Sequence, residues 1–164
     1  MGVAVDIGAF RSAMARFPGA VTIITALHGT ERRGITATAV CSVTAEPPSL
    51  LVCVNRKTGT CAAIEAGGHF VVNLLADPAT PLALRFAGAD GATGAGKFDL
   101  GQWSADAQGL PVLDEALVSI SCKVAESVQT GSHMVFIGQI TQIRHGSGLP
   151  LVYEQARFHR LAPL

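Results

Sequence analysis

Short stretches of apolar and β-branched residues recur along most of the chain, with polar or glycine-containing turns between them. Such stretches predict β-strands. They cover residues 20–26, 34–43, 49–54, 70–75, 117–124, 134–143, 151–153 and 158–161. The stretch at 34–43 is long enough for one strand or a pair of strands. The stretch at 49–54 is apolar almost throughout, which predicts a strand buried on both faces, whereas the alternation at 117–124 predicts one buried face.

Helical spacing of apolar residues is limited to short segments. Phe10, Met14 and Phe17 lie at the spacing of one helix face within residues 9–17, and Pro18-Gly19 follows as a stop signal. Short helices are also predicted at 58–66 and 81–87. Four glycines separated by small residues predict a loop at 88–96.

The order of these elements indicates a mainly β fold with a few short helices. The short connections are typical of hairpins, and long βαβ crossovers are missing, which disfavours a doubly wound parallel sheet. A closed or nearly closed antiparallel barrel is expected, because closure removes exposed strand edges. The length of 164 residues fits a single domain over residues 1–164.

Charge and composition exclude some partners and suggest another. Twelve basic and twelve acidic residues give a formal net charge of zero, which provides no attraction to nucleic acid or to an anionic membrane. Because 49% of residues are hydrophobic and 15% are charged, we expect a second copy to cover part of the surface, as in a homodimer. No signal peptide is visible and no apolar run reaches the roughly 18 residues of a membrane helix, so we expect a cytoplasmic protein.

Familiar catalytic motifs do not account for the chain. Gly91–Lys97 fits the GxxxxGK pattern of a phosphate-binding P-loop, but Phe98 follows where Mg²⁺ coordination needs a hydroxyl, so we interpret the match as chance. No GxGxxG follows a strand, and no nucleophile, acid–base or metal-ligand set is present. The cysteines are interpreted as reduced thiols, and no metal is expected. An enzyme of this composition would need a cofactor to carry its chemistry.

A series of segments, each weak alone, covers nearly the whole chain in order. They are Phe10–Met14, Phe17–Thr25, Gly34–Pro48, Leu51–Asn55, Gly68–Leu75, Phe86–Gly88, Lys97–Phe98, Gly131–His133 and Gly138–Ile140. Together they resemble the short-chain flavin reductases, which are the reductase partners of two-component flavin-dependent monooxygenases. The resemblance implies an FMN-binding split β-barrel, antiparallel and Greek-key-like.

The resemblance also implies a flavin site, for FMN or FAD, with a strand beside the ring and a turn at the phosphate. The implied ring-facing residues are Thr36, Ala37, Thr38, Ala39, Ser42 and Val43. The turn at Asn55, Arg56, Lys57, Thr58 and Thr60 offers hydroxyls, cations and free N–H groups at a helix start, which suits a phosphate. Either segment alone would be read as an ordinary strand or a solvated turn. Further implied flavin contacts are Cys53, Val54, Phe86, Ala87, Gly88, Lys97 and Phe98.

Several of the implied roles have a plain alternative. Lys97 either approaches the flavin or is a surface lysine. The resemblance implies that His133 helps to place the nicotinamide. The alternative is a solvated or hydrogen-bonded histidine without a functional role. Tyr153 and Phe158 either stack on a ring or pack the end of the barrel. Trp103 is expected to pack in the core.

The expected activity is NAD(P)H:flavin oxidoreduction, with direct hydride transfer, no catalytic side chain, and release of reduced flavin to a monooxygenase. The sequence leaves FMN or FAD, and NADH or NADPH, undecided. One alternative is a split-barrel protein that holds FMN tightly as an oxidase or redox sensor. Another is a barrel that binds or scaffolds without redox activity.

Overall fold

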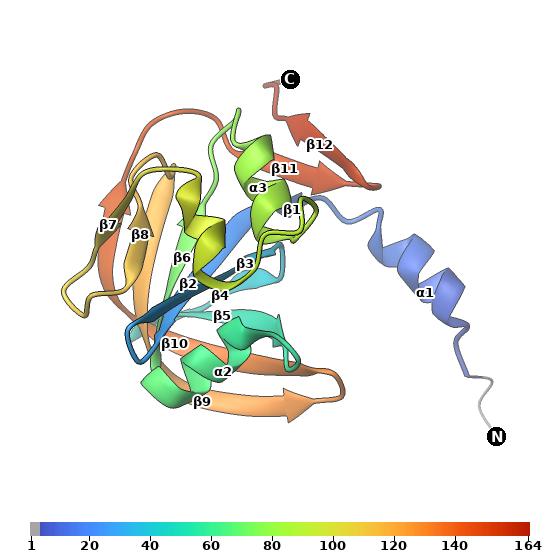
Figure 1. Cartoon of the computed structure of the whole chain (residues 1–164). Coiled ribbons are helices and arrows are strands. Elements are labelled where there is room, and N and C mark those ends of the chain that lie inside the picture. Colours follow the sequence, from blue (N-terminus) through green and yellow to red (C-terminus); the bar gives the residue numbers. More distant parts are fainter. Residues whose placement is uncertain (1–3) are drawn as a thin grey trace.

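The computed structural model describes residues 4–164. Helical segments lie at Ile7–Met14 (α1), Gly59–Gly67 (α2), Thr80–Phe86 (α3) and, as a 3-10 helix, Gly94–Asp99 (η1). The strands are Gly19–Ala20 (β1), Thr22–His28 (β2), Glu31–Ala37 (β3), Val40–Ala45 (β4), Pro48–Asn55 (β5), His69–Leu74 (β6), Trp103–Ala105 (β7), Pro111–Leu113 (β8), Val118–Thr130 (β9), His133–His145 (β10), Leu151–Glu154 (β11) and Arg157–Arg160 (β12). Figure 1 shows their arrangement.

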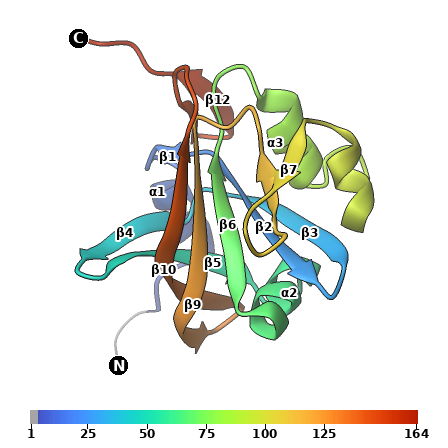
Figure 2. The same cartoon turned by 90° about the vertical axis from the view of Figure 1, so that its left-hand side faces the viewer.

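Seven of the strands form one sheet in the order β3-β2-β6-β9-β10-β5-β4, with every neighbouring pair antiparallel. The two edge strands, β3 and β4, are joined by Thr38 and Ala39 alone, so the sheet curls until its edges meet at this connection (Figure 2). The predicted mainly β, antiparallel split barrel is confirmed. Two smaller sheets, β1-β11-β12 and β7-β8, flank it.

The interior of the curled sheet holds the larger hydrophobic core. Buried side chains of β2, β5, β6 and β10 meet there, among them Ile24, Val52, Phe70 and Phe136. Helix α2 covers this core with Cys61, Ala63 and Ile64. The apolar face predicted for β9 is confirmed, because Ile120, Cys122 and Val124 all contact this core. The expectation of a single buried face is wrong, because Ser119 and Ser121 on the other face are also buried.

A second core lies on the outer face of β2. Val21 and Ile23 pack there against Leu82 and Phe86 of α3, and against Phe98 of η1. The strand buried on both faces is therefore β2. The expectation that residues 49–54 form such a strand is wrong, because their outward side chains stay partly exposed.

One buried amide links the strands on which this second core rests. The Asn73 side chain, fully buried on β6, donates to the Ile23 carbonyl (3.1 Å) and the Thr25 hydroxyl (3.3 Å). Its oxygen accepts from the Leu113 N–H (2.9 Å) and the Ser119 hydroxyl (2.9 Å). The amide therefore joins β2, β6, β8 and β9 through bonds that water cannot replace at this depth.

Some elements are longer than the sequence predicted, and others were not predicted at all. The β7–β8 pair was not expected, because each strand has three residues and lies within polar, turn-rich sequence. Strands β9 and β10 run several residues beyond 117–124 and 134–143, into a mostly exposed region around the hairpin turn. The last three residues of the predicted glycine loop, 94–96, belong to η1 instead.

Two of the cysteines are buried and chemically quiet. Burial raises the pKa of Cys122 to about 12. Burial, reinforced by the nearby Glu65 carboxylate, also raises the pKa of Cys61. Neither thiol forms appreciable thiolate at neutral pH.

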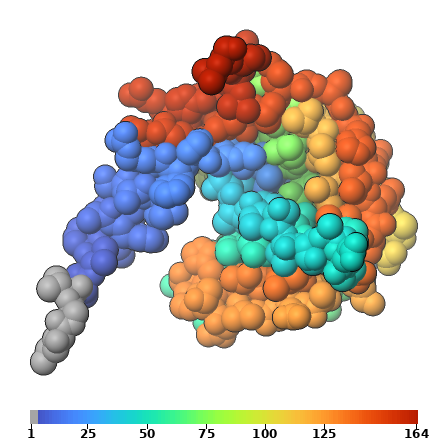
Figure 3. Space-filling view, turned by 180° about the vertical axis from the view of Figure 1, so that it is seen from behind, coloured from blue at the N-terminus to red at the C-terminus, as the bar shows by residue number. Residues whose placement is uncertain are grey.

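Helix α1 extends away from the body of the molecule and buries none of its residues (Figures 1 and 3). Its apolar residues are exposed, with 56% of Phe10 and 48% of Met14 accessible, as is 67% of Phe17 just after it. Strand β4, at the opposite edge of the sheet from β3, is also largely exposed. None of the helices between residues 4 and 164 combines the length and the hydropathy needed to cross a membrane.

Candidate functional site

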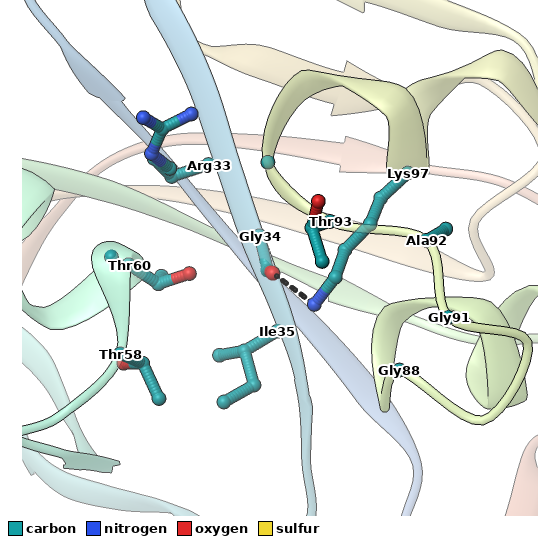
Figure 4. A pocket seen from close by; sticks show the side chains of 12 residues that line it. Arg33, Gly34, Ile35, Thr58, Thr60, Gly88, Gly91, Ala92, Thr93 and Lys97 are labelled. Carbon is teal, nitrogen blue, oxygen red and sulfur yellow. Dashed lines mark hydrogen bonds between the residues drawn. The ribbon is translucent and has the colours of Figure 1, made fainter.

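A cavity of about 460 Å³ lies between β3, the start of α2 and the glycine loop that leads into η1. Figure 4 shows side chains from all three segments around it. Its lining residues are Arg33, Gly34, Ile35, Thr58, Gly59, Thr60, Gly88, Gly91, Ala92, Thr93, Gly94 and Lys97. Because β3 is an edge strand, the cavity lies along an open edge of the barrel.

The N-terminus of α2 forms one wall of this cavity. Thr58 caps the helix: its hydroxyl accepts from the Cys61 N–H (3.2 Å) and donates to the Asn55 carbonyl (2.8 Å). The N–H groups of Gly59 and Thr60 lie in the first turn, where a helix offers no carbonyl partner. This end of the helix therefore presents free donors and a partial positive charge to the cavity.

Lys97 forms the opposite wall and is held by backbone carbonyls. Its ammonium donates to the Phe86 carbonyl (2.8 Å) and, more weakly, to the Gly34 carbonyl (3.4 Å). Burial lowers its pKa, and the Asp90 carboxylate opposes this effect. Lys97 is thus a partly buried clamp between the loop, α3 and β3, and not a free surface lysine.

Arg85, on α3, fixes the rest of the glycine loop. Its guanidinium donates to the carbonyls of Lys97 (3.0 Å) and Gly96 (2.6 Å) and pairs with Asp90 (2.8 Å). Asp90 in turn accepts from the Ala92 N–H, which is the first cause of its lowered pKa. The loop predicted at 88–96 is therefore held in one shape, although its glycines alone would leave it free.

Two predicted flavin contacts, Phe86 and Phe98, lie beneath the cavity and not on its surface. Their rings are buried and meet edge to face, with centroids 5.0 Å apart, and Trp103 packs on both. A Cβ on Gly34 would lie 2.6 Å from the Phe86 ring, so only glycine allows this approach to β3. Trp103 packs in the core as predicted.

A second cavity, of about 270 Å³, adjoins the other end of β3. It brings together Thr36, Ala37 and Thr38 with Ala87 and with the aromatic pair Tyr153 and Phe158. The two aromatic rings are 5.1 Å apart, and 38% of Tyr153 is exposed. Segments that are far apart in the sequence thus line one apolar slot, next to the polar cavity.

His133 lies beside the predicted phosphate turn. It pairs with Asn55 across β10 and β5, and the Ser132 carbonyl accepts from the Arg56 N–H (3.0 Å). Its Nδ1 is 2.9 Å from the Ser132 hydroxyl, and its side chain is exposed. The Lys57 N–H donates to the Asn55 side chain (2.9 Å), which shapes the turn.

Other predicted contacts line neither cavity. Ser42 and Val43 are exposed on β4, Ala39 belongs to the β3–β4 connection, and Cys53 is partly exposed on β5. The side chain of Val54 points into the barrel core, where 2% of it is accessible. In one molecule, therefore, the residues predicted at the ring are divided between the slot and an uncovered edge strand.

Sequence reasoning missed several lining residues, of which Arg33 is the most polar. It precedes the strand predicted at 34–43, but in the structure the turn is confined to Gly29 and Thr30, and Arg33 belongs to β3. The repeated glycines at 91 and 94 were dismissed with the P-loop match. These glycines line the cavity because Arg85 and Lys97 hold the loop in place, and no local sequence pattern reveals those contacts. Among residues 4–164 no cluster of side chains suited to a metal ion occurs.

Comparisons with known proteins agree with this geometry. The family model described as flavin reductase like domain matches residues 14–162. The chain is 42% identical over 154 residues to the FMN reductase (NADH) RutF of Pseudomonas syringae pv. syringae, covering 93% of this chain and 85% of that protein. It is 40% identical over 156 residues to the 4-hydroxyphenylacetate 3-monooxygenase reductase component of Pseudomonas aeruginosa, covering 93% and 91%.

A solved structure has a similar fold. Flavin reductase PheA2 in its native state superimposes with a TM-score of 0.88 at 33% identity, over 97% of this chain and all (100%) of that one.

The close approach at Gly34 yields a prediction about stability. Gly34→Ala should lower the free energy of unfolding by about 1–3 kcal/mol, because the new methyl group would force Phe86 and Phe98 apart. Gly96→Ala is the matched control: its Cβ would have no neighbour closer than 4.0 Å, and a change within about 0.5 kcal/mol is expected. Urea unfolding measures both, and equal effects would contradict the packing described here.

Proposed function

The chain belongs to the family of flavin reductase like domains, and on that premise we propose that it reduces flavin with a reduced nicotinamide nucleotide. The resemblance seen in the sequence is confirmed at the level of the family. The observation that carries the proposal is the pair of adjoining cavities along β3, one polar and one apolar, which match the two ends of a flavin nucleotide.

The polar cavity fits a phosphate. Gly59 and Thr60, whose N–H groups are free at the start of α2, line it together with the cations Arg33 and Lys97. The predicted phosphate-turn residues Asn55, Arg56 and Lys57 precede this helix but do not line the cavity. A helix N-terminus binds anions through both its donors and its dipole. Thr58 holds this turn in place, because its hydroxyl is engaged in capping.

The apolar slot fits a flat ring. The Thr36 hydroxyl donates to the Ala83 carbonyl (2.6 Å), which ties α3 to β3. N–H and C=O groups of alternate residues leave an antiparallel strand on the same side. Since the Gly34 carbonyl faces the open edge, toward Lys97, the same edge offers the N–H of Thr36 to a ring oxygen.

When bound, a flavin accepts hydride from reduced nicotinamide, so the protein must mainly hold two rings in contact. No side chain of this chain is assigned an acid–base step. Donors on the β3 edge would stabilise negative charge that develops on the flavin pyrimidine oxygens. Tyr153 and Phe158 would close the far side of the slot, and His133 would orient the nicotinamide from the hairpin beside Asn55.

The reductase would act with a second enzyme. Relatives in this family are reductase components of two-component monooxygenases, and by analogy this chain would release reduced flavin to an oxygenase in the cytoplasm. We also propose that it forms a homodimer. The exposed apolar residues of α1 and the uncovered β4 strand support this, because monomers seldom expose such surfaces together.

The activity is tested by following NADH and NADPH oxidation with FMN, FAD and riboflavin. Turnover that depends on added flavin is expected. If the purified protein retains FMN through gel filtration and oxidises neither nucleotide, the tightly bound flavoprotein replaces this proposal. If no flavin changes its spectrum or its melting temperature, a barrel without redox function replaces it.

His133→Ala should raise KM for the nicotinamide substrate by about three- to tenfold and change KM for flavin little, since one orienting contact is lost. His145→Ala, at the far end of the same strand, is the control and should change neither constant. Steady-state kinetics with each substrate varied in turn separates the two. An equal rise in both KM values would remove His133 from the nicotinamide site.

Replacing Phe10 and Met14 by Glu should weaken the dimer by about a hundredfold or more, because two carboxylates would enter an apolar contact. Ser12→Glu, on the opposite face of α1, is the control. Sedimentation equilibrium gives the dissociation constants. An unmodified protein that stays monomeric at high concentration would refute the dimer.

A further inference from the structure

We propose that Arg33 and Thr60 make the polar cavity selective for flavins that carry a phosphate, and that Glu31 competes with this phosphate for Arg33. The inference rests on the proposed flavin reductase function and names which flavins the site prefers. Arg33 and Glu31 were not among the residues expected from the sequence, whereas Thr60 was expected in the phosphate turn.

Arg33 lies between the two walls of the polar cavity. A Cβ on Gly59, the first residue of α2, would lie 3.1 Å from its Nε. A Cβ on Gly94, at the start of η1, would lie 3.2 Å from its Nη1. Glycine at both positions therefore lets the guanidinium pass close to the helix start and to the loop. This places a permanent positive charge close to the start of α2, where the free N–H groups lie.

Thr60 supplies an independent sign of a ligand. Only 3% of this residue is accessible, and it lines the cavity. Figure 4 shows its hydroxyl pointing toward the space between α2 and β3. Within residues 4–164 the Thr60 hydroxyl makes no hydrogen bond and its oxygen keeps some accessible surface, whereas the hydroxyl of Thr58, two residues earlier, is engaged in two hydrogen bonds. An unbonded hydroxyl of a buried residue, with its oxygen accessible from the cavity, can donate to an oxygen of a ligand.

The charges around the cavity explain why the ligand would be an anion. Arg33 and Lys97 are the cations that line it, and Lys97 is already bonded to two carbonyls. Asp90 is paired with Arg85. Within residues 4–164, Glu31 is the one carboxylate bonded to Arg33; it is 61% exposed in its side chain and lies two residues away on the same strand.

The Glu31–Arg33 ion pair is weak. Both partners are on one edge strand and Glu31 is mostly in water, so the pair contributes little to stability. A phosphate dianion at the start of α2 offers Arg33 more charge and two oxygens in a fixed geometry. Glu31 can then turn to solvent. Glu31 and the phosphate thus compete for Arg33. Removal of Arg33 should lower the affinity for phosphate, and removal of Glu31 should raise it.

Binding is measured by quenching of flavin fluorescence with the full-length protein and without nicotinamide, so that the readout does not depend on turnover. FMN and riboflavin share the ring and differ in the phosphate. Unmodified protein should bind FMN at least about tenfold more tightly than riboflavin, as one charge-assisted contact provides. Arg33→Gln should remove about tenfold of FMN affinity and leave riboflavin unchanged.

Glu31→Gln is the decisive variant, because it should act in the other direction. FMN affinity should rise by about two- to fivefold, the range expected for loss of an exposed competing ion pair, and riboflavin affinity should stay the same. Thr60→Val, which keeps the shape of the side chain, should weaken FMN about threefold. Arg32→Gln is the control for charge alone, since its guanidinium lies 5.5 Å over the Phe98 ring and lines a different cavity.

The outcomes separate this inference from the function on which it rests. Equal affinity of the unmodified protein for FMN and riboflavin, or a fall in FMN affinity on Glu31→Gln, overturns the inference and leaves the reductase intact. Phosphate selectivity that depends on Arg33, in a protein that oxidises neither NADH nor NADPH, supports the subsite and overturns the reductase. Loss of riboflavin binding together with FMN binding in Arg33→Gln also overturns the inference.

Discussion

The contact between the rings of Phe86 and Phe98 and the backbone of β3 at Gly34 positions everything around the candidate site. Because Gly34 has no side chain, α3 and η1 can approach the edge of the barrel closely. That approach brings the Phe86 carbonyl and the Gly34 carbonyl within reach of one ammonium, that of Lys97. The glycine loop is then fixed as a wall of the polar cavity. A single missing side chain thus determines where an open strand edge becomes a binding surface.

The split in the barrel provides the polar groups that the site needs. A closed barrel would pair every N–H and C=O of its strands, whereas β3 keeps one side unpaired along the cavities. Exposed edges invite aggregation, and here the glycine loop, Lys97 and Arg33 cover the edge. The remaining free donors are available to a ligand. The second edge, β4, has no such cover within residues 4–164, and the proposed homodimer would supply one.

The sequence predicted the fold and the family well, and the details of the site less well. Strands with strong β-branched patterns, such as β2, β5 and β6, were found because burial imposes those patterns locally. The short β7–β8 pair escaped, because it is held by a distant amide, Asn73, and not by its own residues. Phe86 and Phe98 belong to the site's neighbourhood, but as support beneath it. Arg33 was missed because its value depends on Gly59 and Gly94, which are distant in sequence.

The two buried thiols have a consequence for survival in air. Reduced flavin that is free in solution reacts with oxygen and yields hydrogen peroxide, so a protein that releases it works beside a source of oxidant. Peroxide attacks thiolates, and the cysteines at 61 and 122 remain protonated because burial raises the pKa of each. Sulfenic acid formation in the barrel core would introduce a polar group among Ile64, Phe70 and Phe136. The depth of these two residues therefore protects the barrel core from the by-product of the proposed reaction, whereas Cys41 on β4 is exposed to it.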